Sequence, residues 1–239
     1  MNNPNGPYPG RQLFLGVTVK GHPFFSYLVT GRSPESRERK AVQIGDIIRM
    51  GPLGNQPYDP LRHYAAVKFE NTSGLVVVSN GIQTEAIFET YKLLLNTSVA
   101  PSVDFVEKLL DGAGAEPDSY HTPRIAGIVT SSGSPDPRPV FILGMKAFNT
   151  PARGFQISPA PGKMIGISTY KGSLDSPEAR DPGTALPEVD FSGFSANDLA
   201  RHLFDISAAV YKGNDIRVCA VAGIRLEKGW DLSIQNVHQ

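Results

Sequence analysis

Residues 64–95, YAAVKFENTSGLVVVSNGIQTEAIFETYKLLL, carry the pattern that decides the fold class. Tyr64–Phe69 and Leu75–Ser79 are short apolar runs separated by Asn-Thr-Ser-Gly, which predicts a β-hairpin. The three consecutive valines of the second run are typical of a strand that is covered on both faces. After the turn at Asn80-Gly81, Thr84–Leu95 repeats apolar side chains at helical spacing. The stretch therefore predicts a buried hairpin followed by a helix.

Strand patterns dominate on both sides of this stretch. The expected strands are Arg11–Lys20, Phe24–Thr30, Ala41–Met50, Ile125–Thr130, Pro139–Lys146, Gly154–Ser158, Met164–Tyr170, Ile216–Leu226 and Trp230–Val237. Two more helices are expected, Ser102–Leu110 with Ser102 as its cap and Gly112 and Gly114 as stop signals, and Ala196–Tyr211. This order lacks regular βα alternation, which disfavours a doubly wound parallel sheet. We expect an α+β fold of two stacked, mostly antiparallel sheets with helices outside.

The composition limits the class of protein. The chain has 239 residues, of which 40% are hydrophobic, enough for one large core, and we expect a single domain over residues 1–239. Its 23 Lys+Arg balance 23 Asp+Glu, which argues against a general nucleic-acid binder. The single cysteine disfavours a disulfide framework and indicates a cytoplasmic location. No signal peptide or membrane span is expected. Residues 1–10 are predicted to form a flexible arm and residues 173–195 a surface excursion.

Several common site signatures are missing from the sequence. There is no P-loop and no Gly-x-Ser-x-Gly elbow. The five histidines never stand at a paired metal spacing, so no metal site is expected. Cys219 lies in the near-continuous apolar run Val218–Ala222, which indicates a core residue and not a nucleophile.

Polar residues gather instead where predicted strands end, which is where sites are often built. The segments are Tyr27–Arg32, Ser79–Gly81, Glu116–Ile125 and Ser168–Gly172. Behind the first of them, Gly31–Lys40 holds four basic residues against two acidic ones, the densest positive stretch of the chain. A small anionic ligand is compatible with this pattern despite the zero net charge.

Six short segments occur together in the order and approximate spacing of a known family. They are Gly10-Arg11, Tyr27, Arg32-Ser33, Val77–Gly81, His121–Ala126 and Ile167–Tyr170. On these residues the chain resembles the archaeal-type IMP cyclohydrolase family. The resemblance covers residues 10–172, and the part from Ser173 onward is interpreted as an extension.

The resemblance implies a fold and a reaction. The family has an N-terminal-nucleophile hydrolase-like fold, a four-layer αββα sandwich, without using an N-terminal nucleophile. It closes 5-formamido-AICAR ribotide to IMP with loss of water, the last step of purine biosynthesis, and it needs no cofactor. The expected partner is thus a small purine ribonucleotide. A homo-oligomer formed through outer helices or exposed edges is a further possibility.

Site residues follow from the matched segments and from residue chemistry. The expected catalytic residues are Arg32, Glu116, Asn80 and His121. The expected substrate-binding residues are Tyr64, Arg124, Tyr170, Arg37, Thr122 and Ser33, with Arg39 and Lys40 as further candidates near a phosphate. Arg32 suits a phosphate or an oxyanion, Glu116 and His121 suit proton transfer, and Asn80 suits donation to the formyl or carboxamide oxygen. Each residue type also has a structural explanation, such as a surface ion pair, a turn or core packing.

The chain departs from the family pattern at two positions. His121 stands where the family has asparagine, and Val67 stands where it has a second tyrosine, three residues after the one matched by Tyr64. An alternative is therefore a non-catalytic or altered-specificity relative that binds purine nucleotides. An amide hydrolase is a third hypothesis, disfavoured because the expected N-terminal arm offers no activated nucleophile.

Overall fold

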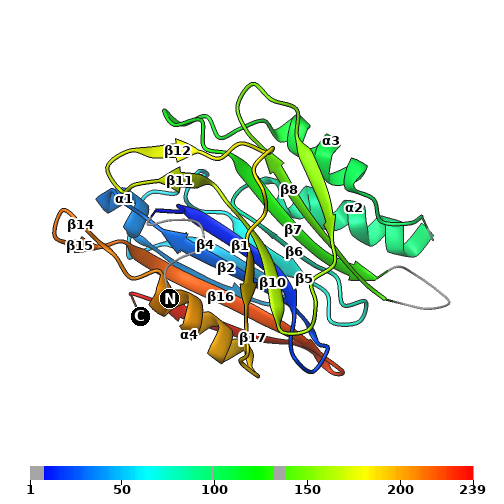
Figure 1. Cartoon of the computed structure of the whole chain (residues 1–239). Helices are drawn as coiled ribbons and strands as arrows, with labels where there is room; N and C mark the ends of the chain where they lie inside the picture. The colour runs from blue at the N-terminus through cyan, green and yellow to red at the C-terminus, as the bar shows by residue number, and fades with distance from the viewer. Residues whose placement is uncertain (1–7, 98, 132–137, 239) are drawn as a thin grey trace.

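Two antiparallel sheets contain most of the strands (Figure 1). The computed structural model describes residues 8–97, 99–131 and 138–238. The seven-stranded sheet runs in the order β3 (Arg39–Ile44), β4 (Ile47–Pro52), β5 (Ala65–Phe69), β6 (Val76–Ser79), β7 (Arg124–Ser131), β8 (Pro139–Lys146) and β9 (Arg153–Ile157). The predicted hairpin at residues 64–79 is confirmed as β5 and β6.

The six-stranded sheet joins the two ends of the chain. Its order is β13 (Glu188–Asp190), β10 (Lys163–Ser168), β1 (Arg11–Val17), β2 (Pro23–Thr30), β16 (Arg217–Leu226) and β17 (Gly229–Asn236). Two small hairpins lie outside the sheets, β11 (Tyr170–Gly172) with β12 (Pro177–Ala179), and β14 (Val210–Tyr211) with β15 (Asn214–Asp215).

The two sheets face each other across the main hydrophobic core. Alternate residues of β2, such as Phe25, Tyr27 and Val29, point into this core, where they meet Ile125 and Val129 of β7. The period-two alternation of a strand sends neighbouring side chains to the opposite face. The sheets therefore form a sandwich, as the sequence predicts.

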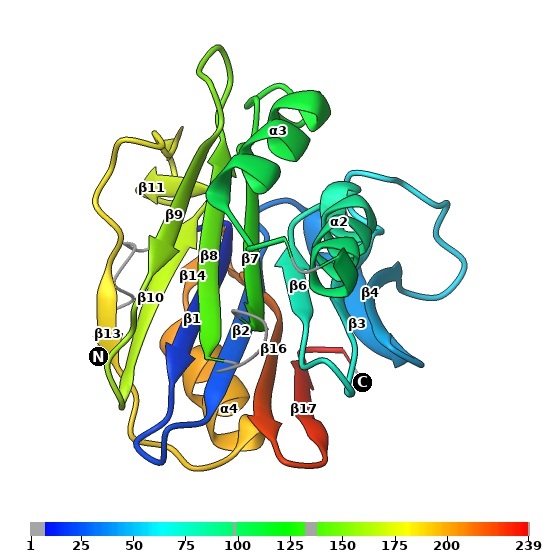
Figure 2. The ribbon, with the colours of Figure 1, turned by 90° about the vertical axis from the view of Figure 1, so that its right-hand side faces the viewer.

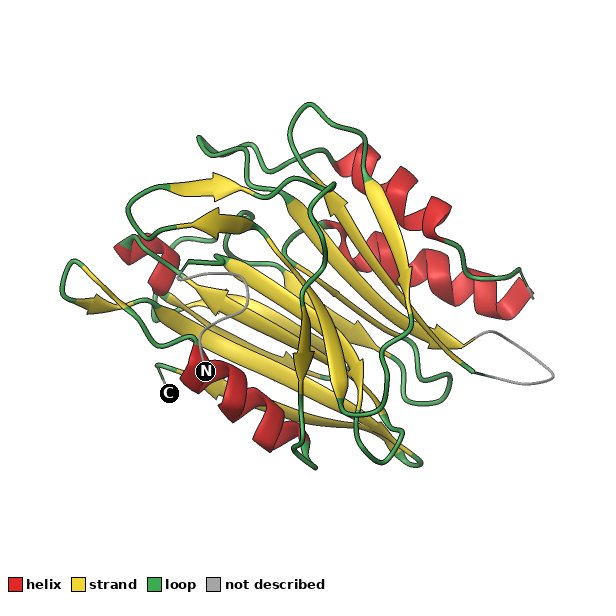
Figure 3. Cartoon of the chain, in the orientation of Figure 1, coloured by secondary structure: helices red, strands yellow, loops and turns green. Residues whose placement is uncertain are grey.

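Helices cover the outer faces. Leu75, which directly precedes β6, and the strand residues Val77 and Ile128 pack under α2 (Gln83–Thr97) and α3 (Val103–Ala113). On the other sheet, Phe24 and Leu28 pack under α4 (Ala196–Ile206). The layers thus run helices, sheet, sheet, helix (Figures 2 and 3). None of the helices in the described residues is long and apolar enough to cross a membrane.

Three element predictions need correction. The expected strand Ala41–Met50 is two strands, β3 and β4, because Gly45 has a φ of +62° and makes a tight turn with Asp46. The expected helix Ala196–Tyr211 ends at Ile206, and its last two residues form β14. The basic stretch also contains the one-turn helix α1 (Pro34–Arg37), which the sequence pattern did not predict.

Two segments expected at the surface are partly built into the fold. Of the predicted N-terminal arm, residues 1–7 lie outside the described residues, and Tyr8, Pro9 and Gly10 are buried. Within residues 173–195, β13 pairs with β10, and the side chains of Arg180 and Phe191 are buried. Both segments therefore contribute to the sandwich or to its end.

Candidate active site

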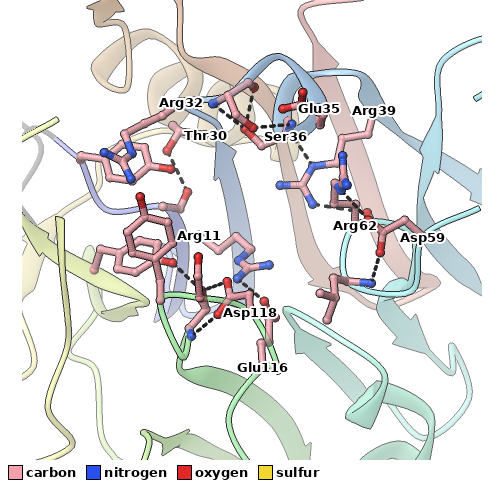
Figure 4. A pocket seen from close by; sticks show the side chains of 18 residues that line it. Arg11, Thr30, Arg32, Glu35, Ser36, Arg39, Asp59, Arg62, Glu116 and Asp118 are labelled. Atoms are coloured by element: carbon pink, nitrogen blue, oxygen red, sulfur yellow. Dashed lines mark hydrogen bonds and ion pairs between the residues drawn. The ribbon is translucent and has the colours of Figure 1, made fainter. Parts of the chain in front are cut away.

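One end of the sandwich opens into a cavity of about 460 Å³, within the usual size range of small-molecule sites. Antiparallel pairing brings the start of β1, the end of β2 and the start of β11 together there, beside α1 and the loops around Asp59 and Asp118. The lining residues are Tyr8, Gly10, Arg11, Thr30, Arg32, Ser33, Glu35, Ser36, Arg39, Asp59, Leu61, Arg62, Glu116, Asp118, Ser119, Tyr120, Thr122 and Tyr170 (Figure 4).

Glu116 is the buried acid of this cavity, with only 3% of its surface exposed. Its Oε2 accepts a hydrogen bond from Arg11 Nη2 at 2.8 Å. Its Oε1 accepts one from Asn80 Nδ2 at 3.3 Å and lies 3.9 Å from Arg124 Nη1. A carboxylate is thus held between two buried arginines on the cavity wall.

Burial and charge act on this group in opposite directions. Loss of water raises the pKa of Glu116 above its ordinary value, and the charges of Arg11 and Arg124 only partly offset that rise. Burial disfavours the charged form of Arg11, yet the nearby carboxylate of Glu116 holds the Arg11 pKa well above its usual value. Arg11 therefore stays charged, and Glu116 is suited to exchange a proton nearer to neutrality than an exposed glutamate.

Asn80 holds the site together from behind the cavity wall. Its Nδ2 donates to Pro123 O at 2.9 Å and to Glu116, and its Oδ1 accepts from the backbone N–H of Ile125 at 2.8 Å. Both amide hydrogens are therefore already used. Asn80 lies outside the cavity lining, and its hydrogen bond holds Glu116 in position.

Arg124 is fixed in the same framework. Its Nη1 donates to Gln83 Oε1 at 3.1 Å, and its Nε is buried without a hydrogen-bond partner. Gly81 leaves the space for it, because a β-carbon at Gly81 would lie 2.3 Å from Arg124 Nη1. Arg124 therefore acts on the cavity through Glu116.

Arg32 stands at the opposite side of the mouth among aromatic rings. Its guanidinium carbon lies 5.2 Å from the ring centre of Tyr8, 5.3 Å from that of Tyr120 and 5.9 Å from that of Tyr211. Its Nη1 donates to the backbone carbonyl of Leu174 at 2.8 Å. Cation–π contacts of this kind hold a guanidinium in place without neutralising its charge.

Tyr170 connects the tyrosines around Arg32 with Thr122 and Asp118 in the cavity lining. Tyr170 stacks on Tyr8 with ring centres 5.8 Å apart, and its hydroxyl bonds the Thr122 hydroxyl, which in turn donates to Asp118. Burial raises the pKa of Tyr170 to about 12, so the phenol stays protonated. Gly10 has a φ of +68°, and a β-carbon there would lie 2.5 Å from the Tyr170 ring, so glycine permits this close approach.

Tyr64 lies deeper, outside the cavity lining. Its hydroxyl bonds the Tyr27 hydroxyl at 2.7 Å, and both residues are buried. Val67, at the position where the family pattern has a second tyrosine, is completely buried in the core between the sheets. Tyr27 is therefore the side chain that pairs with Tyr64 here.

The remaining predicted residues divide between the cavity and its surroundings. Ser33 lines the cavity. Arg37 donates to the backbone carbonyl of Arg32 at 2.7 Å and, like Lys40, lies outside the lining. His121 is exposed, adopts a φ of +48° and stacks on Phe148 with ring centres 3.8 Å apart, so it does not face the cavity.

Several lining residues were absent from the predicted site. Arg11 pairs with Glu116, which is 105 positions away in the sequence. The sequence does offer one signal for Arg11, because a charged residue stands there at the start of an apolar strand, directly after Gly10. Arg62 binds Asp59 at 2.6 Å in the loop between β4 and β5, which shows no site motif in the sequence. Tyr8 lies within the segment that was expected to be flexible, so no pattern in the sequence indicated that it lines the cavity.

A family model described as "IMP cyclohydrolase-like protein" matches residues 8–229. The chain belongs to the IMP cyclohydrolase-like family. The match extends far beyond residue 172, so the expectation that the part from Ser173 onward is an unmatched extension was wrong. The buried Arg11–Glu116 pair and the Arg32 cluster both lie within the region that the IMP cyclohydrolase-like family covers.

Curated archaeal relatives of the IMP cyclohydrolase-like chain carry the name IMP cyclohydrolase. One from Methanothrix thermoacetophila is 27% identical over 233 residues, which cover 96% of this chain and 98% of the relative. One from Methanococcus aeolicus is 32% identical over 127 residues, 52% of this chain and 59% of the relative. One from Methanocaldococcus jannaschii is 32% identical over 123 residues, 51% of this chain and 56% of the relative.

Proposed function

We propose that this chain is an IMP cyclohydrolase, which closes 5-formamido-AICAR ribotide to IMP with loss of water. The observation that carries the proposal is Glu116, a buried carboxylate between Arg11 and Arg124 at a cavity of small-molecule size, in a chain of the IMP cyclohydrolase-like family. A purine ribonucleotide is accordingly the proposed partner.

The reaction joins two groups of one molecule. The carboxamide nitrogen attacks the formyl carbon, and a new C–N bond forms while the formyl oxygen takes up negative charge. One hydrogen then leaves the carboxamide nitrogen and one leaves the formamide nitrogen, and the former formyl oxygen departs with both as water. Orientation of such intramolecular partners can contribute up to about 7–11 kcal/mol. No cofactor is required for this balance.

Glu116 is the proposed proton carrier. As a carboxylate it accepts the hydrogen of the carboxamide nitrogen, and as a carboxylic acid it returns a proton to the departing hydroxyl. Its burial supports both roles, because a raised pKa brings the two protonation states closer in free energy at neutral pH. Arg11 holds the carboxylate in place through its 2.8 Å hydrogen bond.

Arg32 is the proposed donor to the developing oxyanion. Its charge is permanent, and the tyrosine rings and the carbonyl of Leu174 hold it at the cavity wall. A donor that is fixed before the reaction stabilises the new charge without reorganising. Ser33, Thr122 and Tyr170 are the proposed neighbouring substrate contacts, since all three line the cavity.

The wider proposals follow from the same assignment. We infer an N-terminal-nucleophile hydrolase-like fold that works without an N-terminal nucleophile, supported by the facing antiparallel sheets and their outer helices. A single buried cysteine is compatible with work in the cytoplasm. Association into a homo-oligomer stays a proposal.

The experiment compares the wild type with Glu116→Gln and Glu89→Gln. Each protein is given formyl-AICAR ribotide, and IMP formation is followed by ultraviolet absorbance. Glu116→Gln removes the proton acceptor and should lower kcat by roughly a hundred- to ten-thousandfold. Glu89 is an exposed residue of α2 that pairs with Lys68 on the outer face, so its variant should keep wild-type turnover.

The wild-type result decides the function itself. If the wild type forms no IMP above the uncatalysed rate between pH 6 and 9, the proposed function fails. If the wild type is active and Glu116→Gln is equally active while folded, the role of Glu116 fails alone.

A second candidate is a relative that binds a purine nucleotide without turnover. The two departures from the family pattern favour it. Val67 is buried in the core and has no hydroxyl to replace that of the family's tyrosine, and His121 faces away from the cavity and cannot supply a proton there. Calorimetric titration with AICAR ribotide and IMP is therefore combined with the assay of IMP formation from formyl-AICAR ribotide. Tight binding in the titration without IMP formation in the assay supports the second candidate, whereas binding with turnover of formyl-AICAR ribotide rejects it.

A further inference from the structure

We propose that Arg39 is the phosphate anchor of this site, so that the nucleotide lies with its phosphate beside Arg39 and its heterocycle between the tyrosines around Arg32 and Glu116. This assignment rests on the proposed function for the identity of the ligand. It gives the two sides of the cavity different tasks and leaves Arg32 free to meet the reacting oxygen.

Four arginines line the cavity, and two of them are already paired with carboxylates. Arg11 is paired with Glu116 at 2.8 Å, and Arg62 is paired with Asp59 at 2.6 Å. Arg32 is packed among three tyrosine rings. These three side chains are fixed within the protein before a ligand arrives.

Arg39, the first residue of β3, differs from Arg11 and Arg62 in having no carboxylate partner, and from Arg32 in being buried. Its side chain is 3% exposed, its Nε donates to Ser36 O at 3.0 Å and its Nη1 donates to Arg62 O at 3.3 Å. Carbonyl oxygens orient a guanidinium but carry no full negative charge. Among the described residues no carboxylate pairs with Arg39, and its Nη2 has no hydrogen-bond partner.

A buried guanidinium cannot relieve its charge by losing a proton, because arginine stays protonated in proteins. A buried charge without a counter-ion is unfavourable, and an anion from outside would compensate it. A phosphate monoester suits this place, since it presents several acceptor oxygens to the planar fork of an arginine. The two carbonyl groups therefore orient the Arg39 guanidinium, and the phosphate of the ligand would supply the negative charge that neutralises it.

The acidic residues on this side do not neutralise Arg39. Asp59 accepts from Arg62 and from the backbone N–H of Leu61 at 2.9 Å, and Glu35 is an exposed residue of α1. Figure 4 shows Arg39 and Arg62 together on one side of the cavity, Arg32 on the other, and Arg11 with Glu116 between them. A ribotide that spans the cavity from Arg39 thus places its heterocycle near Glu116.

The test compares a nucleotide with its nucleoside. The dissociation constant of IMP is measured by calorimetry and that of inosine by ligand-observed NMR, for the wild type, Arg39→Gln and the matched control Arg201→Gln. Arg201 is an exposed arginine of α4, so its variant removes the same charge far from the cavity. Arg39→Gln should weaken IMP roughly ten- to hundredfold and leave inosine within about twofold.

Loss of packing is separated from loss of charge by a second variant. Arg39→Lys keeps the charge but not the fork, and should weaken IMP less than Arg39→Gln does, with thermal unfolding recorded for both. Equal losses in the two variants, equal weakening of IMP and inosine, or an IMP affinity of Arg39→Gln within twofold of the wild type would each overturn the anchor.

Failure of the anchor can be told from failure of the function. A wild type that binds IMP but never forms it, with binding lost in Arg39→Gln alone, removes the cyclohydrolase proposal and keeps the anchor. If the wild type forms IMP and the Arg39→Gln variant binds IMP normally, the cyclohydrolase proposal stands and the anchor is rejected.

Discussion

Glu116 shows how a single side chain is prepared for its task by two opposing forces. The pocket wall removes water from the carboxylate, and Arg11 and Arg124 return part of the lost stabilisation. Asn80 Nδ2 is a fixed hydrogen-bond donor to Oε1, the carboxylate oxygen that Arg11 does not bind. The acid is therefore both oriented and held at a raised pKa.

The direction of this pKa shift predicts the pH dependence of turnover. In the proposed mechanism Glu116 must be deprotonated to accept the carboxamide hydrogen, so activity should be full above its pKa and be lost as the pH falls through it. Because burial raises that pKa, the acidic limb of kcat/KM should lie above the ordinary value of a glutamate. The measurement is a pH–rate profile of the wild type between pH 4 and 9.

Glu116→Asp serves as the comparison for this profile. It keeps a carboxyl group but draws it back by one methylene from Arg11 and Arg124, so a weaker activity with a displaced acidic limb is expected. An acidic limb that is identical in both proteins would assign the titration to another group.

Sequence reasoning reached the cavity through residues that stand in short motifs. Arg32, Ser33, Glu116, Thr122 and Tyr170 all line it. The pairing of Glu116 with Arg11 could not be predicted, because it depends on which strand ends meet across the sandwich. The orientation of His121 could not be predicted either, since its positive φ and its contact with Phe148 turn it outward.

At the scale of elements, α4 depends on a capping box. Ser195 Oγ accepts from the Asp198 backbone N–H at 3.1 Å, and the Asp198 carboxylate accepts from the Ser195 backbone N–H at 3.1 Å. Ser195→Ala removes one acceptor for an otherwise unpaired N–H and should lower the free energy of unfolding by about 1 kcal/mol. Urea unfolding measures it.

The exposed Ser192 provides the control for that cap. Ser192→Ala should change the free energy of unfolding by less than about 0.5 kcal/mol, as is usual for surface positions. If the two variants unfold at the same urea concentration, the cap does not stabilise the protein.

Elements were predictable where local signals agreed. The Ser102 cap and Gly114 end of α3 are confirmed, with Ser102 Oγ accepting from Asp104 N at 3.2 Å, but Gly112 is not a stop signal because it lies inside the helix, which runs to Ala113. The β3–β4 hairpin was missed because apolar residues continue on both sides of Gly45-Asp46, so a two-residue turn looks like part of one strand. The end of α4 was misplaced because Val210 continues the helical spacing by coincidence.

At the scale of the whole molecule, stability rests on the core between the sheets. Leu13 of β1 is completely buried there, and a β-carbon on Gly127 of β7 would lie 2.4 Å from its side chain. Leu13→Ala should therefore lower the free energy of unfolding by about 2–5 kcal/mol. Chemical denaturation followed by circular dichroism measures the change.

Leu93 is the matched control for Leu13, because it lies on α2 with 60% of its surface exposed. Leu93→Ala should change stability by less than about 0.5 kcal/mol. A Leu13→Ala variant as stable as Leu93→Ala would mean that the sheets do not pack as described.

The stacking of two antiparallel sheets followed from the order of strand and helix patterns, but the strand order within each sheet did not. Nothing local to β16 shows that it lies between β2 and β17. That neighbour relation joins Tyr27 to Val221, nearly two hundred residues apart, and only the complete sheet defines it.

The strand order of the six-stranded sheet constrains how the protein is made. β2 is synthesised long before its hydrogen-bonding neighbour β16. Tyr8 and Tyr211, which both contact Arg32, are likewise separated by about two hundred residues of synthesis. The nascent chain therefore carries an unpaired edge of β2 while the residues between Thr30 and Arg217 are made, and chaperones have that interval in which to act.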